Sequence, residues 1–126
     1  MSEYVIISNS TDLFRFVAEN IVFIVSDGNY SYVYTCDNKK HMLLVQLGKI
    51  EEEITNQLER SDQFLVRIGK SLIVNMLYVS HINPSKQRIV FSDNRTFTID
   101  STTVEGLKVS KEALKGLKDY FDKKQK

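Results

Sequence analysis

Few side chains in this sequence are of the types that enzymes use for catalysis. Its 126 residues include two histidines and one cysteine. Cys36 and His41 are five positions apart across a predicted turn, and a cysteine nucleophile requires a base within hydrogen-bonding distance. A cysteine at the end of an aromatic strand more commonly acts as a small apolar residue, and we favour that interpretation. We therefore predict no catalytic residues, no enzymatic activity and no small-molecule substrate.

The acidic residues do not form a recognisable metal site. Glu51, Glu52 and Glu53 are consecutive and fall in a segment with helical periodicity. Consecutive side chains on a helix diverge by about 100°, so the three carboxylates do not converge on one ion. The sequence also has no zinc-ligand spacing and no glycine-rich phosphate loop. We predict neither a bound metal nor a cofactor.

The basic residues are unevenly distributed along the chain. Residues 1–60 hold five Lys/Arg against nine Asp/Glu, a net charge of −4, whereas residues 61–126 hold twelve against seven, a net charge of +5. Positive charge concentrated in one part of a chain is a feature of proteins that bind polyanions such as nucleic acids. The charge distribution is thus a weak indication of such a surface in the second half.

The stretch RIGKSLIVN, from Arg67 to Asn75, places two cations around a glycine at the start of an apolar run. Gly69 predicts a break between two strands, with Lys70 and Ser71 at a tight loop tip. Such a tip is narrow enough to enter the major groove of DNA, which is about 12 Å wide. The alternative is that Arg67 and Lys70 are only the solvent-exposed ends of two alternating strands.

Most of the chain alternates apolar and polar residues with the period of two that is typical of β-strands. In the turn Ser26–Asn29, Asp27-Gly28 supplies residues that accept a positive φ, and Asp37–Lys40 is expected to form another turn. The expected strands are Tyr4–Ser8, Asp12–Val17, Asn20–Val25, Tyr30–Cys36, His41–Leu47, Gln63–Ile68, Ser71–Asn75, Leu77–Ile82, Arg88–Ser92 and Arg95–Ile99.

Two segments have helical periodicity instead. Within residues 48–61, with Leu47 just before them, apolar residues recur at intervals of three and four, which predicts one helix in mid-chain. After Thr102 the chain again becomes helical, with a capping-box spacing from Thr102 to Glu105 and a second cap at Ser110. The final segment has an apolar stripe formed by Leu114, Leu117, Tyr120 and Phe121, and a lysine-rich polar face.

The length fits a single domain, and no linker or repeat divides residues 1–126. No apolar run approaches the roughly 20 residues of a membrane span, and the start MSEYVIISNS lacks the basic region and cleavage site of a secretory signal. One cysteine cannot form an internal disulfide, in keeping with a reducing compartment. We expect a cytoplasmic protein that does not contact a membrane.

Three segments together resemble the LytTR domain of bacterial transcription regulators: ENIVFIVSDGNYSYVYT, FLVRIGKSLIVNMLYVSHI and RIVFSDNRTFTI. The resemblance covers about residues 10–108, followed by a lysine-rich helical tail at about 109–126. Two motifs carry it, an acidic-Gly-Asn-Tyr turn at Asp27–Tyr30 and an R-x-x-R/K-S-x-x-V-N signature that begins at Arg67. The resemblance implies a mainly β fold, an elongated stack of antiparallel sheets, in a sequence-specific regulator that reads double-stranded DNA with loops in successive major grooves.

The resemblance also implies which residues contact DNA. They come from the first hairpin (Asn29, Tyr30, Ser31), from the RIGKS loop (Arg67, Lys70, Ser71) and from the segment after the last strand (Ser101, Thr102). Lys39 and Lys40 are expected to contact the phosphate backbone. For Asn29 an alternative stays open, in which it only tolerates the backbone of a type I′ turn.

The sequence departs from the family at several points. Relatives usually have arginine after the last strand, where this chain has IDSTT with an acidic Asp100, and many have histidine at Gly69. Most relatives also follow a receiver domain, for which this chain has no room, so a homodimer or a regulatory protein partner is expected to provide control. The alternative function is a protein-interaction module that binds a partner through strand edges or the terminal helix. A clustering of Lys39, Lys40, Lys70, Arg88 and Arg95 around Asn29 would favour DNA binding, whereas a scattered arrangement would count against it.

Overall fold

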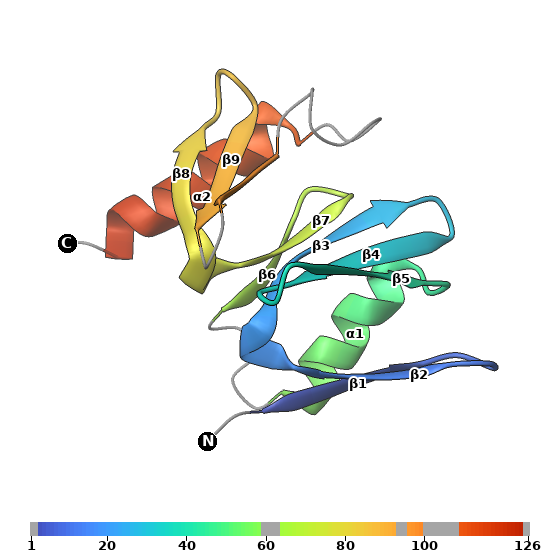
Figure 1. Ribbon diagram of the computed structural model, residues 1–126. Coiled ribbons are helices and arrows are strands. Elements are labelled where there is room, and N and C mark those ends of the chain that lie inside the picture. The colour runs from blue at the N-terminus through green and yellow to red at the C-terminus, as the bar shows by residue number, and fades with distance from the viewer. Residues whose placement is uncertain (1–2, 59–63, 93–95, 100–108, 125–126) are drawn as a thin grey trace.

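The computed structural model describes residues 3–58, 64–92, 96–99 and 109–124. The described strands form three antiparallel sheets stacked one above another (Figure 1). The predicted mainly β fold with one helix in mid-chain and one at the C-terminus is therefore confirmed. The first sheet contains β1 (Tyr4–Ser8) and β2 (Leu13–Val17), the second has the order β5 (Lys39–Leu43), β4 (Tyr30–Thr35), β3 (Ile21–Asp27), β7 (Leu72–Asn75), β6 (Leu65–Ile68), and the third has the order β10 (Thr96–Ile99), β9 (Arg88–Ser92), β8 (Val79–Asn83).

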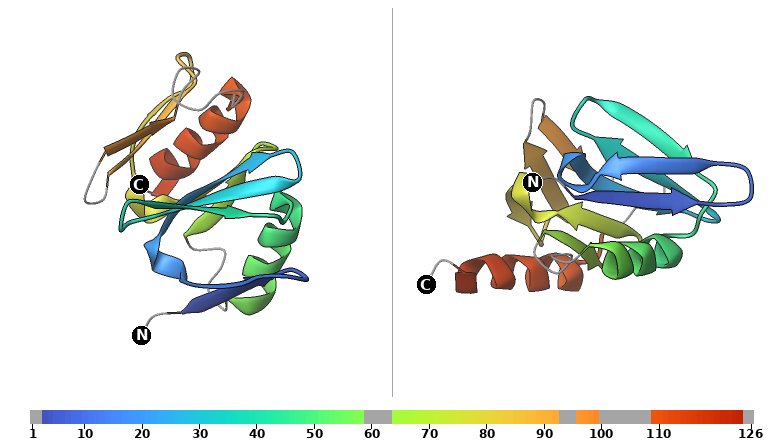
Figure 2. Two further views of the ribbon diagram at one scale, coloured as in Figure 1. Left: turned by 45° about the vertical axis from the view of Figure 1, so that its right-hand side comes forward. Right: turned by 90° about the horizontal axis from the view of Figure 1, so that it is seen from below.

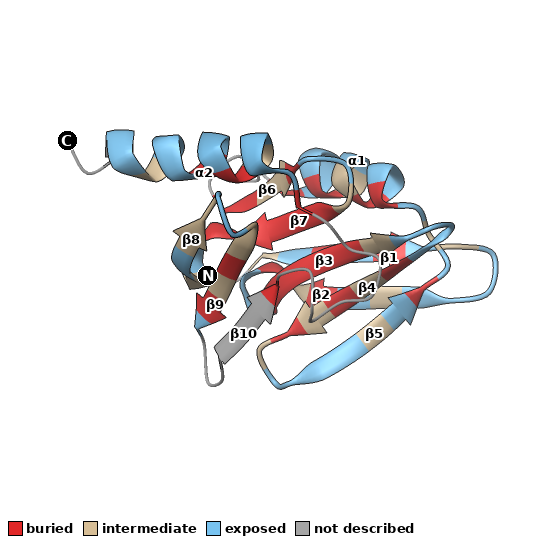
Figure 3. Cartoon of the chain, turned by 90° about the horizontal axis from the view of Figure 1, so that it is seen from above, coloured by how far each residue is buried: buried red, intermediate tan, exposed pale blue. Residues whose placement is uncertain are grey.

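The middle sheet is covered on both faces, and β3 runs through its centre. Its residues Ile21–Val25 are all buried, which explains why this strand is a continuous apolar run and not an alternating one (Figure 3). On one face, Ile24 packs against the first sheet and α1 (Leu47–Gln57), while on the other face Phe23 stacks on Phe91 of the third sheet with ring centroids 5.0 Å apart. The fold therefore has two hydrophobic cores, one in each gap between sheets.

α1 fills the gap between the first and middle sheets and also protects an open strand edge. Its last residue, Gln57, accepts a hydrogen bond from the Ile6 N–H and donates one to the Ile6 carbonyl, both at 2.7 Å. The side-chain amide thus replaces a neighbouring strand at the free edge of β1, where unpaired backbone groups would otherwise favour aggregation.

The C-terminal helix α2 (Lys111–Lys124) packs against the second core. Leu114 and Leu117 are buried there, and the Ala113 N–H bonds to the Ser110 hydroxyl at 3.0 Å, so the predicted cap at Ser110 is confirmed. The predicted start at Thr102 lies outside the described residues. No helix in the described part of the chain is long and apolar enough to cross a membrane.

Several predicted boundaries are wrong in detail. Strand β5 begins at Lys39, because the turn before it needs only residues 36–38, with Asn38 at a positive φ of 67°. Lys39 and Lys40 therefore lie in a strand and not in a turn. Where a strand from Leu77 was predicted, the structure first has a 3₁₀ turn, Met76–Tyr78, whose Leu77 N–H is capped by the Asn75 side chain.

Asn75 is a fully buried polar residue at the end of β7. Its side-chain oxygen accepts from the Leu77 N–H at 2.9 Å, and its amide nitrogen donates to the carbonyls of Ile21 at 2.8 Å and Glu19 at 3.3 Å. These bonds join the start of β3 to the turn that leads into the third sheet. Asn75 therefore connects the middle sheet to its neighbour.

Candidate nucleic-acid interface

The two hairpin tips predicted to contact DNA lie at the same end of the middle sheet (Figure 1). β3 pairs in antiparallel register with both β4 and β7, so the β3–β4 turn and the β6–β7 turn leave the sheet at one end. A backbone hydrogen bond from Ser26 N to Ser71 O, 2.8 Å long, joins the two hairpins just below their tips. Residues about 40 positions apart in the sequence are thereby held side by side.

The first tip consists of Gly28 and Asn29, between the paired residues Asp27 and Tyr30. Gly28 has a φ of +63°, whereas Asn29 has no positive φ, which fits a type II′ turn and not the type I′ alternative. Asn29 is exposed, and its side-chain oxygen accepts a hydrogen bond from Gln46 Nε2 at 3.1 Å. Tyr30 is 41% exposed at the base of the tip. Asn29 and Tyr30 are thus accessible to a ligand.

The structure corrects the prediction for Ser31. This residue is fully buried, and its hydroxyl donates to the Val45 carbonyl at 2.7 Å. Ser31 alternates with Tyr30 and Tyr32 along β4, so its side chain points into the sheet layer that faces α1. It anchors the connection between β5 and α1 and does not present a group to DNA.

The second tip is the β6–β7 turn, in which Gly69 has a φ of +62°. Lys70 is exposed, and Ser71 is half-buried. The predicted loop tip is therefore confirmed, and the left-handed conformation explains why glycine occupies position 69.

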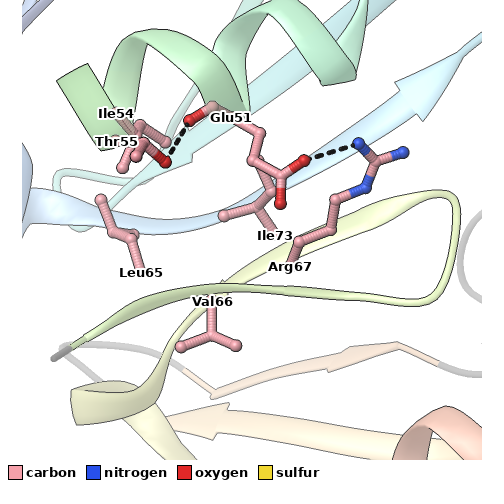
Figure 4. Close-up of a pocket in the computed structure, with 7 residues that line it drawn as sticks. All are labelled: Glu51, Ile54, Thr55, Leu65, Val66, Arg67 and Ile73. Atoms are coloured by element: carbon pink, nitrogen blue, oxygen red, sulfur yellow. Dashed lines mark hydrogen bonds and ion pairs between the residues drawn. The ribbon is translucent and has the colours of Figure 1, made fainter. Parts of the chain in front are cut away.

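Arg67 has a different position from the one predicted. Its guanidinium pairs with Glu51 on α1, with 3.0 Å between Nη1 and Oε1 (Figure 4). It also donates to the Lys70 carbonyl at 3.0 Å. Only 27% of its side chain is exposed. Arg67 therefore supports the Lys70 loop. This arrangement fits neither the predicted direct contact with DNA nor the alternative of a free cation at the end of a strand.

Replacing Arg67 with alanine is expected to lower the free energy of unfolding by about 1 to 2 kcal/mol, because a half-buried ion pair and a hydrogen bond to the loop are lost. Urea unfolding followed by circular dichroism measures this. Lys49→Ala is a matched control, since the Lys49–Glu52 pair is exposed and 3.8 Å long. Unchanged stability combined with a weaker salt dependence of DNA binding would instead show that Arg67 contacts phosphate.

Lys39 and Lys40 lie at the opposite end of the middle sheet from Asn29 and Lys70. Lys40 Nζ is 4.3 Å from the Tyr32 ring centroid. Lys39 Nζ is 4.0 Å from Asp37 Oδ2. A hydrogen bond from the Thr35 hydroxyl lowers the pKa of the Asp37 carboxyl group. The predicted clustering of cations around Asn29 therefore does not include these two lysines, and by that criterion their position counts against DNA binding.

The other predicted site residues are only partly placed. Arg88 lies on the third sheet, half-buried, while Arg95, Ser101 and Thr102 lie outside the described residues. In the described part of the chain, no group of three His, Cys, Asp or Glu side chains could hold a metal ion. Sequence reasoning missed Gln46, for which the only signal was its place just before the helix.

The model of the LytTr DNA-binding domain family matches residues 12–122. The chain belongs to this family. Among solved structures, a LytTr DNA-binding domain from Bacillus cereus is similar, with a TM-score of 0.59 and 14% sequence identity over 94% of this chain and 96% of that one. At that identity the similarity shows the fold alone. No curated protein sequence matches the chain. As a LytTR domain, the protein belongs to a family of DNA-binding regulators.

Proposed function

We propose that this LytTR domain is a sequence-specific transcription regulator that reads double-stranded DNA with the tips at Asn29 and Lys70. The observation that carries the proposal is the shared end of the middle sheet, where the Ser26–Ser71 hydrogen bond holds the two tips together. Asn29 offers an amide to base edges, and Lys70 offers a cation to a guanine edge or a phosphate. Tyr30 and Ser71 provide further contacts at the bases of the tips.

The spacing of the tips limits how they meet DNA. The two hairpins are centred two strand spacings apart in the order β4, β3, β7, β6, which is roughly 10 Å. One major groove is about 12 Å wide, whereas successive major grooves are about 34 Å apart. The two tips therefore fit one groove and the phosphates that border it. Reading of a second groove would then fall to another segment, for which Ser101 and Thr102 are the candidates.

The two helices contribute favourable electrostatics at this end. α1 begins directly after Gln46, which bonds to Asn29, and α2 begins near Gly69, where an added Cβ would lie 3.6 Å from the Ala113 Cβ. Both helices lie along one side of the molecule (Figure 2). Since the N-terminal end of a helix carries partial positive charge, both dipoles favour an anion beside the tips.

A fluorescence-anisotropy titration tests this function. The labelled ligand is a pool of random duplex DNA, measured at two salt concentrations and followed by sequence selection. We expect binding that weakens with salt, by a slope of about −0.9 per neutralised phosphate, together with enrichment of one sequence. Absence of binding at low salt by the folded protein would overturn the proposal and favour the protein-interaction module.

We further propose that the protein acts in the bacterial cytoplasm under control of a homodimer contact or a protein partner.

A further inference from the structure

We propose that Gln46 is a positioning residue for base recognition, which holds the Asn29 amide in the orientation that selects adenine. This inference rests on the proposed function, because it assumes that the Asn29 tip enters a groove. It adds a residue outside both tips and names the base that the first tip reads.

The backbone of Gln46 is held in place by the start of α1. Its extended conformation (φ −72°, ψ 150°) precedes the helix, and its carbonyl accepts from the N–H groups of Lys49 at 3.1 Å and Ile50 at 3.2 Å. The side chain makes no capping bond to the helix, and it donates from Nε2 to Asn29 Oδ1 at 3.1 Å. The Gln46 side chain is thus directed at the tip.

The segment before Gln46 is fixed from two sides. The buried Ser31 hydroxyl holds the Val45 carbonyl at 2.7 Å, and Asn9 in the β1–β2 turn donates to the Leu44 carbonyl at 3.3 Å. The first bond joins this segment to the β3–β4 hairpin, and the second joins it to the sheet formed by β1 and β2. Gln46 and Asn29 are therefore placed relative to each other before DNA binds, which reduces the entropy lost on recognition.

The hydrogen bond determines which groups of Asn29 remain available. Its oxygen accepts one hydrogen from Gln46 and keeps one lone pair, while both hydrogens on Nδ2 stay free. Adenine presents an acceptor at N7 and a donor at N6, which match this pattern. Guanine presents acceptors at N7 and O6, so the Asn29 oxygen would face another acceptor. The orientation held by Gln46 therefore favours adenine over guanine.

Changing Gln46 to glutamate should reverse this orientation. A carboxylate only accepts hydrogen bonds, so Asn29 would have to donate to it from Nδ2, which turns the amide over and exchanges the positions of its oxygen and its remaining N–H at the tip. The donor and the acceptor would then lie in the reverse order, which no longer matches adenine N7 and N6 from the same tip position. Gln46→Ala removes the restraint and leaves the amide free to present either end.

Selection from random duplexes with Gln46→Ala, Gln46→Glu and the parent protein tests the inference. We expect the parent to prefer adenine over guanine at one position by roughly 5- to 150-fold. Gln46→Ala should reduce that preference severalfold at this position alone, and Gln46→Glu should reduce it further at the same position. Asn29→Ala should remove the preference, and adding Gln46→Ala to Asn29→Ala should have no further effect. Asn56→Ala, an exposed amide on the far part of α1, is the matched control and should change nothing.

The outcomes separate the two proposals. A parent protein that selects a sequence, with a Gln46→Ala variant that selects the same bases equally well, would overturn the role of Gln46 and leave the proposed function in place. A change at every position in Gln46→Ala would also overturn it, since it would show a general loss of structure. A parent protein that selects no sequence would overturn the proposed function, and the inference with it.

Discussion

Lys70→Ala is expected to weaken binding to the selected duplex by about 1 to 3 kcal/mol, which is roughly 5- to 150-fold in Kd. Lys70 is exposed at the tip of the β6–β7 turn, next to the Asn29 tip, so its side chain can extend fully toward the DNA. Removing the cation leaves a guanine edge or a phosphate without its partner. Anisotropy titration of the selected duplex and of a scrambled duplex measures the loss for each.

Comparison of the two duplexes tells which group Lys70 contacts. A phosphate contact predicts that both duplexes lose affinity and that the salt slope falls by about 1, whereas a base contact predicts loss on the selected duplex alone. Lys40→Ala is the matched control, because Lys40 is an exposed lysine at the opposite end of the same sheet. If Lys70→Ala and Lys40→Ala behaved alike, the placement of the interface at the two tips would be wrong.

Asn75→Ala is expected to lower the free energy of unfolding by about 3 kcal/mol, the largest effect on stability among the changes considered. The substitution removes three hydrogen bonds, of which the bond to the Ile21 carbonyl is buried and the bond from the Leu77 N–H is part-buried. Because these groups lie where the middle sheet meets the third, we expect the unfolding transition to lose cooperativity as well. Urea unfolding followed by circular dichroism measures the change.

Asn56→Ala is a suitable control for this experiment too, since an exposed polar residue typically changes stability by less than about 0.5 kcal/mol. A loss below 1 kcal/mol in Asn75→Ala would mean that water replaces the amide at this position. The hydrogen bonds of the Asn75 side chain would then not explain why asparagine stands at this position of the signature that begins at Arg67.

The strands and the two tips were predictable because their signals are local. A period of two along the chain identifies a strand, and Gly28 and Gly69 mark turns since few other residues accept a positive φ. Ser110 likewise predicts the start of a helix, because its side-chain hydroxyl can cap the first turn. These features depend on neighbours within a few positions, so the mainly β fold and the tip at Lys70 could be predicted from the sequence.

The roles of individual side chains at the interface depend on partners that are distant in the sequence. Ser31 bonds to Val45, 14 positions away, and Arg67 pairs with Glu51, 16 positions away. The strand pattern assigns each side chain to a face, but it does not tell which group of another element lies opposite. Both residues were therefore expected to contact DNA, and the folded chain uses both to hold its own loops.

Asn29 and Lys70 belong to the same surface only because β3 pairs with β4 on one side and with β7 on the other. β4 runs away from this surface and pairs with β5 in Thr35↔Lys39 and Tyr34↔Lys40, so both lysines lie at the opposite end, although they follow Asn29 by only about ten residues. Amino-acid order alone thus indicated strands, turns and a family of DNA-binding domains. The pairing of strands, which joins distant segments through backbone hydrogen bonds, brings Asn29 and Lys70 together, and the proposed function places these two residues at one DNA groove.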